Sequence, residues 1–206
     1  MRIELCGPLG IGKTTLAQNL SAITGWQLVQ EPVENHPFLR PFYKSPEKFA
    51  FEKNLFFLLD YLHQIKARAD GNFIFDHSAI VHRSYAALNR LAPSEKGVFA
   101  ALDTAIESME PPDLLLNLIC PSDVILSRIV KRGRDFETGV DVSYVKALND
   151  EMQRQVEAVA HYIPTVAVDA AGLDFESRPQ DVEKVLHIIC EHVDSRAATA
   201  PLRKTA

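Results

Sequence analysis

The sequence predicts an α/β fold in which helices flank a five-stranded parallel sheet. Five short apolar runs alternate with longer helical patterns, which is typical of strand–helix–strand units. The runs are rich in Leu, Ile and Val without strict alternation, as expected for parallel strands that are buried on both faces. A glycine-rich segment also separates the first run from the first helix, and a turn of this kind often binds phosphate.

The predicted strands are residues 3–6, 26–30, 72–76, 113–119 and 165–169. The first alternates in polarity and ends at Gly7, and the third is entered through Asp70 and Gly71. The last two follow Pro112 and Pro164. Glycine and proline at these points mark the turns that bound each strand.

The predicted helices are residues 13–23, 46–69, 79–91, 94–109, 122–132, 144–162 and 181–193. The first follows the glycine-rich segment, the second opens at Pro46, and the fifth ends at Gly133. No repeat or linker divides the chain, so residues 1–193 are expected to form one domain. Residues 194–206 mix Ala, Arg, Thr and Pro and are expected to be a disordered tail.

The composition narrows the class of protein. A net charge of −5 argues against a nucleic-acid partner. No apolar run is long enough to span a membrane, and the start lacks the pattern of a signal peptide. Cys6, Cys120 and Cys190 have neither CxxC nor zinc-site spacing. We therefore expect a reduced, cytoplasmic protein without a membrane partner.

The glycine-rich segment from Gly7 to Thr14 matches the phosphate-loop pattern G-x-x-x-x-G-K-S/T. Its glycines allow backbone N–H groups to surround phosphate oxygens, and the next helix points its positive end at the same anion. Lys13 is expected to contact the β- and γ-phosphates of ATP, and the Thr14 hydroxyl to ligate Mg²⁺. The alternative is a glycine-rich turn with a chance lysine. The residues expected to bind ATP here are Gly7, Gly10, Gly12, Lys13, Thr14 and Thr15.

A basic cluster follows the fourth strand and comprises Arg128, Lys131, Arg132 and Arg134. Arginine suits forked contact with phosphate oxygens, so the cluster predicts a mobile lid that neutralises the transferred phosphoryl group. The alternative is a solvated helix end, where basic residues favour the helix dipole.

Two carboxylates lie where predicted strands end. Glu31 follows the second strand and could accept a proton from an attacking hydroxyl, although it could also be a loop acid before Pro32. Asp76 ends the third strand and could help to hold Mg²⁺, or it could cap the next helix.

Together these residues resemble the deoxynucleoside kinase family, in particular its bacterial deoxyadenosine/deoxyguanosine kinase branch. The resemblance runs from residue 1 to about residue 169. It implies a P-loop kinase fold, a lid near residues 128–141 and a homodimer. The shared segments are the phosphate loop, Glu31-Pro32-Val33, Phe42-Tyr43-Lys44-Ser45-Pro46, Phe49-Ala50-Phe51, Asp76-His77-Ser78, and residues 128–137 and 144–149.

The resemblance also implies roles for individual residues. Glu31 would be the general base on a 5′-hydroxyl, and Tyr43 and Glu137 would hold the sugar 3′-hydroxyl. Arg128, Arg132 and Arg134 would cover the phosphates. Asp76 would support the metal.

Several positions depart from the family pattern where the nucleobase is read. Asn54 replaces the usual glutamine, Tyr61 and His77 replace arginines, His82 replaces an acid, and Ala86 replaces an aromatic residue. The resemblance therefore implies altered base recognition. Alternatively, the histidines are ordinary polar residues at a helix start, Tyr61 belongs to the core, and Asn54 faces water.

The sequence thus predicts an ATP-dependent phosphotransferase that acts on the 5′-hydroxyl of a deoxynucleoside or a nucleoside-like small molecule. One alternative is a nucleoside monophosphate kinase, although the arginine usual after Asp76 is His77 here. The other is a regulatory protein that binds nucleotide without catalysis, which would be expected to lose Glu31 or the lid arginines.

Overall fold

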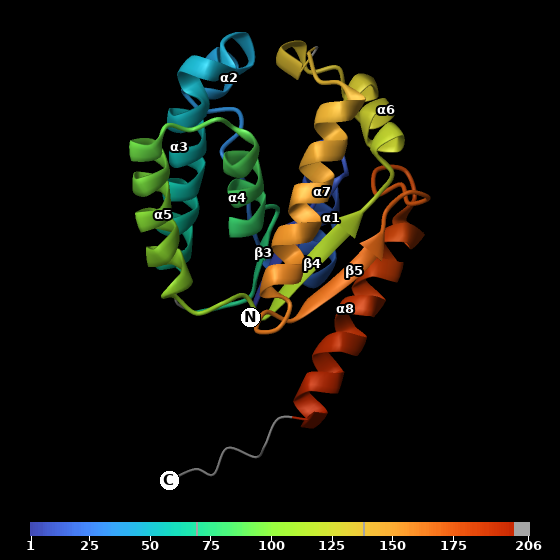
Figure 1. Cartoon of the computed structure of the whole chain (residues 1–206). Coiled ribbons are helices and arrows are strands. Elements are labelled where there is room, and N and C mark those ends of the chain that lie inside the picture. Colours follow the sequence, from blue (N-terminus) through green and yellow to red (C-terminus); the bar gives the residue numbers. More distant parts are fainter. Residues whose placement is uncertain (69, 138, 200–206) are drawn as a thin grey trace.

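All five strands of the sheet are parallel, in the order β2-β3-β1-β4-β5 (Figure 1). This computed structural model describes residues 1–68, 70–137 and 139–199. The strands are β1 (Arg2–Cys6), β2 (Gln27–Val29), β3 (Phe73–Phe75), β4 (Leu114–Ile119) and β5 (Thr165–Asp169). The predicted fold class is confirmed, and each strand lies within one or two residues of its expected bounds.

The register of β1 with its neighbours positions the site. Ile3 pairs with Ile74 of β3 on one side and with Leu114 of β4 on the other. The carboxyl ends of these strands therefore open at the same edge, where the chain order of the sheet reverses around β1. Ligands of open parallel sheets bind at such an edge.

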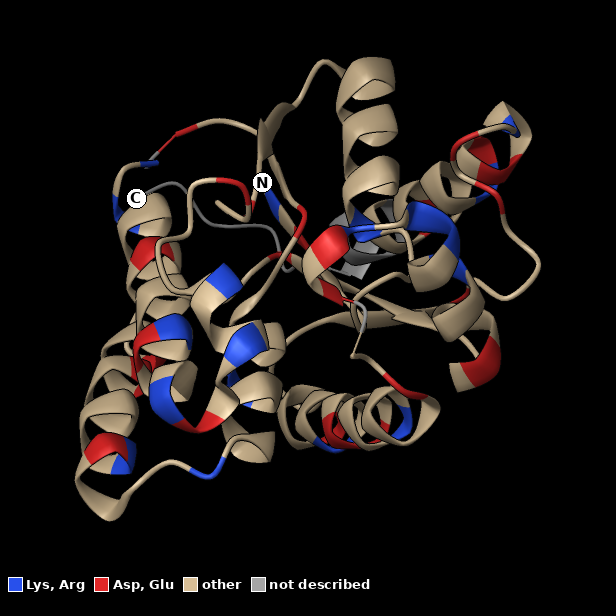
Figure 2. Ribbon diagram, turned by 90° about the horizontal axis from the view of Figure 1, so that it is seen from above, with Lys and Arg blue, Asp and Glu red and all other residues tan. Residues whose placement is uncertain are grey.

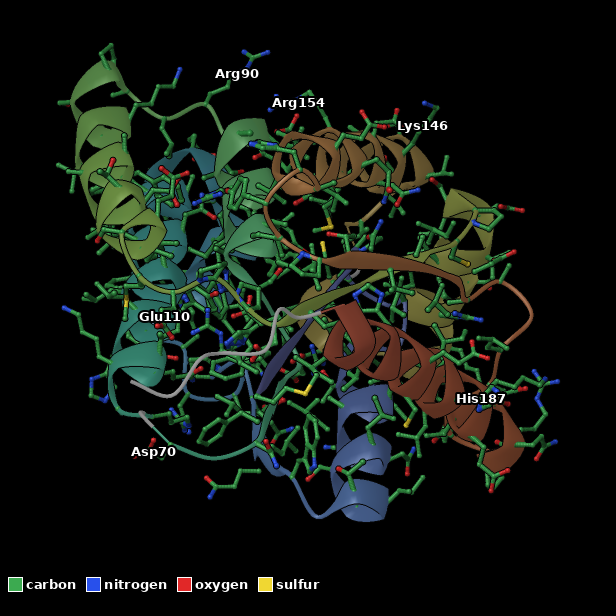
Figure 3. The ribbon with its side chains drawn as sticks, turned by 90° about the horizontal axis from the view of Figure 1, so that it is seen from below. Asp70, Arg90, Glu110, Lys146, Arg154 and His187 are labelled. Atoms are coloured by element: carbon green, nitrogen blue, oxygen red, sulfur yellow. The ribbon has the colours of Figure 1, made fainter. Side chains whose placement is uncertain are left out.

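Helices cover both faces of the sheet (Figures 1 and 3). With α3 and α5 beside them, α4 and α7 lie on one face, whereas α1 and α8 lie on the other. The helices are α1 (Lys13–Thr24), α2 (Leu39–Lys44), α3 (Pro46–Lys66), α4 (Ala79–Leu88), α5 (Pro93–Glu107), α6 (Ser122–Arg132), α7 (Val142–Val159) and α8 (Pro179–Thr199), with a 3₁₀ turn η1 (Asp135–Glu137).

Most predicted helices end within one to three residues of the observed bounds, and three differences are informative. The short helix α2 was not predicted, because Pro41 interrupts its pattern. Asp141 starts α7 early by accepting a hydrogen bond from the backbone N–H of Tyr144. Helix α8 continues past the predicted end at residue 193 to Thr199, so the expected disordered tail is wrong for residues 194–199. Residue 69, which was predicted as helical, and residues 200–206 lie outside the described residues.

Two groups of buried side chains hold the layers together. One lies between the sheet and helices α1, α6, α7 and α8, and includes Leu5, Leu16 and Leu148. The other lies among α3, α4, α5 and β3, and includes Leu58 and Phe75. A cavity at the carboxyl edge of the sheet lies between elements of these two groups.

The distribution of charged and apolar residues in the structure resembles that expected from the sequence. Seen from above, Lys and Arg are interspersed with Asp and Glu over the described helices (Figure 2). None of these helices is long and apolar enough to cross a membrane. In the described part of the chain, Cys6, Cys120 and Cys190 are free thiols.

Candidate active site

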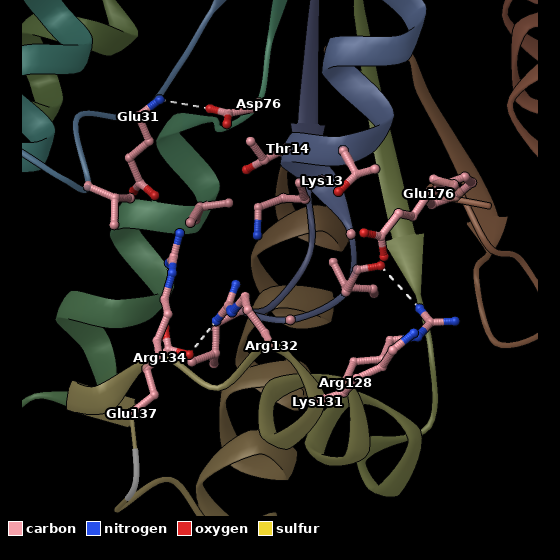
Figure 4. A pocket seen from close by; sticks show the side chains of 18 of the residues that line it. Lys13, Thr14, Glu31, Asp76, Arg128, Lys131, Arg132, Arg134, Glu137 and Glu176 are labelled. Atoms are coloured by element: carbon pink, nitrogen blue, oxygen red, sulfur yellow. Dashed lines mark hydrogen bonds and ion pairs between the residues drawn. The ribbon is translucent and has the colours of Figure 1, made fainter.

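A cavity of about 800 Å³ opens at the carboxyl edge of the sheet. The phosphate loop forms its floor, and the ends of β2 and β3 form one wall (Figure 4). Helices α3 and α4 extend that wall, while α6, η1 and the segment after β5 lie opposite. The cavity therefore joins parts of the chain that are far apart in sequence.

The phosphate loop has the backbone that its glycines allow. Gly10 has a φ of +79° and Gly12 a φ of +106°, values that side-chain-bearing residues rarely adopt. A Cβ on Gly10 would also lie 2.5 Å from Ile129 Cγ1 of α6. The loop thus approaches α6 more closely than a side chain would permit.

Lys13 begins α1 and directs its amine into the loop. Its Nζ donates hydrogen bonds to the carbonyl oxygens of Gly7 (2.7 Å) and Pro8 (3.1 Å). Burial lowers the pKa of Lys13, and the nearby Glu31 carboxylate opposes that shift. The amine is thus positioned beside the loop amides that would surround a phosphate.

Glu31 follows β2 and points into the cavity from the wall opposite the lid arginines (Figure 4). Burial raises the pKa of Glu31 to about 7, which the positive charge of Lys13 opposes and the negative charge of Asp76 reinforces. Its side chain is 21% exposed, and its Oε1 lies 3.7 Å from His82 Nδ1. A carboxylate whose pKa lies near neutrality is suited to accept a proton at physiological pH.

Thr14 and Asp76 face the same part of the cavity, close to Lys13 (Figure 4). Asp76 is buried, and its Oδ1 accepts a hydrogen bond from the backbone N–H of Glu31 at 2.8 Å. A hydroxyl and a carboxylate, together with phosphate oxygens, form the hard oxygen set that Mg²⁺ prefers. These two residues therefore fit the predicted metal site.

The predicted lid residues come together around one carboxylate. Glu137 is buried in η1 and accepts a short hydrogen bond from Arg132 Nη2, and its Oε1 lies 3.6 Å from Arg134 Nη1. Arg134 extends from this turn towards Glu31 (Figure 4). Burial and the charge of Glu137 raise the pKa of Tyr43, which lines the cavity beside it. The predicted pair of Tyr43 and Glu137 is thus brought together. Residue 138 of the lid lies outside the described residues.

Arg128 makes contacts that the lid interpretation did not anticipate. Its guanidinium donates to the carbonyl oxygen of Ile11 in the phosphate loop. It also donates to the carbonyls of Ala170, Ala171 and Leu173 after β5. Arg128 lines the cavity, but in this structure it joins two backbone segments. That arrangement does not fit a mobile lid arginine.

Four residues predicted to contact the base lie behind the cavity wall. Asn54, Tyr61, His77 and His82 are all buried, and none of them lines the cavity. The Tyr61 hydroxyl donates to both carboxylate oxygens of Glu4, at 2.7 and 2.9 Å, inside the core. The expectation that these four residues face the substrate is therefore not met here, and Ala86 is also buried away from the lining.

Neither of the two histidines at these positions carries a positive charge near neutral pH. Burial lowers the pKa of His77 to about 4 and that of His82 well below its usual value. Both rings are therefore neutral near pH 7, and His77 does not supply a positive charge in place of an arginine.

Several residues that line the cavity were missed in the sequence, among them Lys53, Phe57 and Tyr85 in the acceptor wall and residues 171–176 after β5. A signal for Lys53 was present, because it falls between Ala50 and Phe57 on the apolar stripe of α3. A lysine at such a position is rarely buried without a reason.

The sequence of this chain resembles those of known proteins over most of its length. The sequence profile of the family described as deoxynucleoside kinase matches residues 3–194. A deoxyguanosine kinase from Lactobacillus johnsonii is 32% identical over 204 residues, which cover 91% of this chain and 90% of that protein. One from Bacillus subtilis is 27% identical over 192 residues, which cover 89% and 93%.

The fold is also found among solved structures. Deoxyadenosine kinase from M. mycoides with bound dCTP matches with a TM-score of 0.80 at 24% identity, over 93% of this chain and 100% of that one. The family profile and the curated relatives both extend over nearly the whole chain. This chain belongs to the deoxynucleoside kinase family.

Proposed function

We propose that this phosphotransferase moves the γ-phosphoryl group of ATP to the 5′-hydroxyl of a deoxynucleoside or a closely similar small molecule. The observation that carries the proposal is the convergence of Glu31, Lys13 and Arg134 on one cavity. The names of the relatives, which are deoxyguanosine and deoxyadenosine kinases, support the substrate class.

The donor would occupy the half of the cavity that contains the phosphate loop. Loop amides and Lys13 would hold its phosphates, and residues 171–176 with Arg128 would line the space beyond them. Thr14 and Asp76 would hold Mg²⁺, which supplies charge neutralisation between the phosphates. The acceptor would occupy the half that Glu31, Tyr43 and Tyr85 line.

In the proposed step, Glu31 accepts the proton of the acceptor hydroxyl. At the same time, the oxygen of that hydroxyl forms a bond to the γ-phosphorus of ATP. The bond from that phosphorus to the bridging oxygen breaks, and ADP leaves with the electron pair. Lys13, Arg132 and Arg134 would stabilise charge on the transferred group. Tyr43 and Glu137 would orient the sugar through its 3′-hydroxyl.

The alternatives have weaker support. A nucleoside monophosphate kinase needs cations for the acceptor phosphate, and His77 is neutral here. A regulatory protein without catalysis would not need a base whose pKa is about 7. A cytoplasmic location and a homodimer remain part of the proposal, on the strength of the family resemblance alone.

The decisive variant is Glu31→Gln, which keeps the size of the side chain but removes the proton acceptor. General base catalysis contributes roughly 10²–10⁴-fold, so turnover should fall by that factor. ADP release would be measured with ATP and a panel of deoxynucleosides, nucleosides and their monophosphates. ATP affinity, measured by calorimetry, should be nearly unchanged. Glu47→Gln, an exposed acid in the first turn of α3, is the matched control. A Glu31→Gln enzyme with undiminished turnover would rule out Glu31 as the general base.

A further inference from the structure

Lys53 is a buried cation in the acceptor half of the cavity. It lies in the middle of α3, is 4% exposed, and lines the cavity beside Phe57 and Tyr85. One helical turn to either side of it lie the buried apolar residues Ala50 and Phe57. A lysine is rarely buried unless its charge is paired, which raises the question of which group compensates the charge of Lys53.

The contacts of the Lys53 amine are mostly aromatic. Its Nζ lies 4.1 Å from the ring centroid of Tyr85, 4.9 Å from that of Phe42 and 5.8 Å from that of Phe57. It donates one hydrogen bond, of 3.1 Å, to Asn54 Oδ1. Among the described residues, no carboxylate lies within 4.0 Å of it. Within the described structure, ring faces and one amide oxygen thus contact the amine, and no carboxylate touches it directly.

The charge nevertheless persists near neutral pH. Burial lowers the pKa of Lys53 to about 8, and the negative charge of Glu31 limits the shift. A group with this pKa is mostly protonated at pH 7. An ammonium offers three N–H donors, and Asn54 uses one of them. His36 and His82 nearby have lowered pKa values, so they add no positive charge.

Two polar atoms behind this wall of the cavity have no hydrogen-bond partner among the described residues. Asn54 Nδ2 and His82 Nε2 are buried without a hydrogen-bond partner in the described structure. Because Asn54 Oδ1 accepts from Lys53, the remaining end of that amide is a donor. Neither side chain lines the cavity, so the donors that a ligand can reach are the two remaining N–H groups of Lys53. Buried donors are costly to leave unpaired, and the pocket is therefore suited to a ligand that accepts hydrogen bonds.

We propose that Lys53 determines specificity by donating to an oxygen of the acceptor other than its reacting hydroxyl. This inference rests on the proposed function, because it assumes that the acceptor occupies this half of the cavity. The oxygen is either the keto oxygen of a nucleobase or a carboxylate oxygen. An amino group in place of this oxygen would point its N–H donors at the N–H donors of Lys53. The Lys53 charge would then remain unpaired.

The test uses acceptor pairs that differ in this group. Deoxyinosine is compared with deoxyadenosine, deoxyuridine with deoxycytidine, and a hydroxy acid with the amino alcohol of the same chain length. For each pair, kcat/KM and the equilibrium dissociation constant are measured with wild type, Lys53→Met and Lys53→Arg. Lys48→Met is the matched control, since Lys48 is exposed on the same helix.

Wild type and Lys48→Met should favour the oxygen-bearing member by at least about tenfold. Lys53→Met should lose that preference and Lys53→Arg should retain it. A preference confined to the nucleosides would identify a keto oxygen, and one confined to the hydroxy acid a carboxylate. The second result would uphold Lys53 but reject the nucleoside acceptor.

Equal use of both members by wild type, or a ratio that Lys53→Met leaves unchanged, would overturn the role of Lys53 while leaving the kinase proposal intact. If no acceptor is phosphorylated, the kinase proposal fails, and the dissociation constants still decide on Lys53. Because Lys53→Met could alter folding, thermal unfolding of each variant is measured first. If Lys53→Met does not fold, Lys53→Gln takes its place.

Discussion

The backbone N–H of Glu31 donates a 2.8 Å hydrogen bond to the Asp76 carboxylate, which joins the ends of the adjacent strands β2 and β3. Strand β2 has only three residues, so this bond helps to fix where the chain leaves the sheet. The proposed base and the proposed metal residue are therefore positioned by one contact.

The acidity of Glu31 predicts the pH dependence of the reaction. Its pKa is raised to about 7, and only the deprotonated carboxylate accepts a proton. We expect kcat/KM to rise about tenfold per pH unit below about pH 7 and to level off above it. Initial rates at low acceptor concentration measure this profile, with ATP binding at each pH as the control. A flat profile across this range would argue against Glu31 as the base.

The lid arginines should act on the transition state. Arg132→Ala and Arg134→Ala are expected to lower kcat more than they raise the KM for ATP, because charge on the transferred group develops during the reaction. Steady-state kinetics with varied ATP would show the split. Lys146→Ala, an exposed residue of α7, serves as control. An effect on KM alone would mean that the arginines only hold bound ATP.

Tyr61 should matter for stability and not for substrate choice. Tyr61→Phe removes the hydroxyl that bonds to buried Glu4, which should cost about 1–3 kcal/mol. Burial raises the pKa of Glu4 to about 7, and the hydroxyl stabilises its charged form. The loss should therefore be larger above pH 7 than below it. Urea unfolding measures the difference, with the half-exposed Tyr162→Phe as control. If Tyr61→Phe changed the base preference and left the free energy of unfolding unchanged, Tyr61 would act in substrate binding after all.

The proximity of Tyr43 and Glu137 predicts discrimination at the 3′-hydroxyl. A buried polar group left unpaired costs about 1–3 kcal/mol, so a 3′-deoxy acceptor should lose roughly 5–150-fold in kcat/KM. Tyr43→Phe should narrow the gap between the two acceptors, because the partner of that hydroxyl is already missing. Equal rates for both acceptors with wild type would remove this role.

The sequence could predict the sheet and the phosphate loop because both depend on local patterns. Residues 3–6 and 165–169 are apolar runs bounded by turn residues, and the loop carries its own glycine spacing. The acceptor wall was harder to predict. Lys53 and Asn54 are neighbours on α3, about 100° apart around the helix axis, and only the packing of α3 decides which one faces the cavity. Tyr61 was also misassigned, because its partner Glu4 is distant in sequence.

Arg128 has a consequence for the motions of the molecule. Its guanidinium binds the carbonyl of Ile11 and those of Ala170 and Leu173, so the phosphate loop and the segment after β5 share one cation. Opening either segment would break contacts with the same side chain. Amide hydrogen exchange should therefore report the two segments as a single cooperative unit, slowed together when nucleotide binds. In Arg128→Met, the two segments should exchange at separate rates.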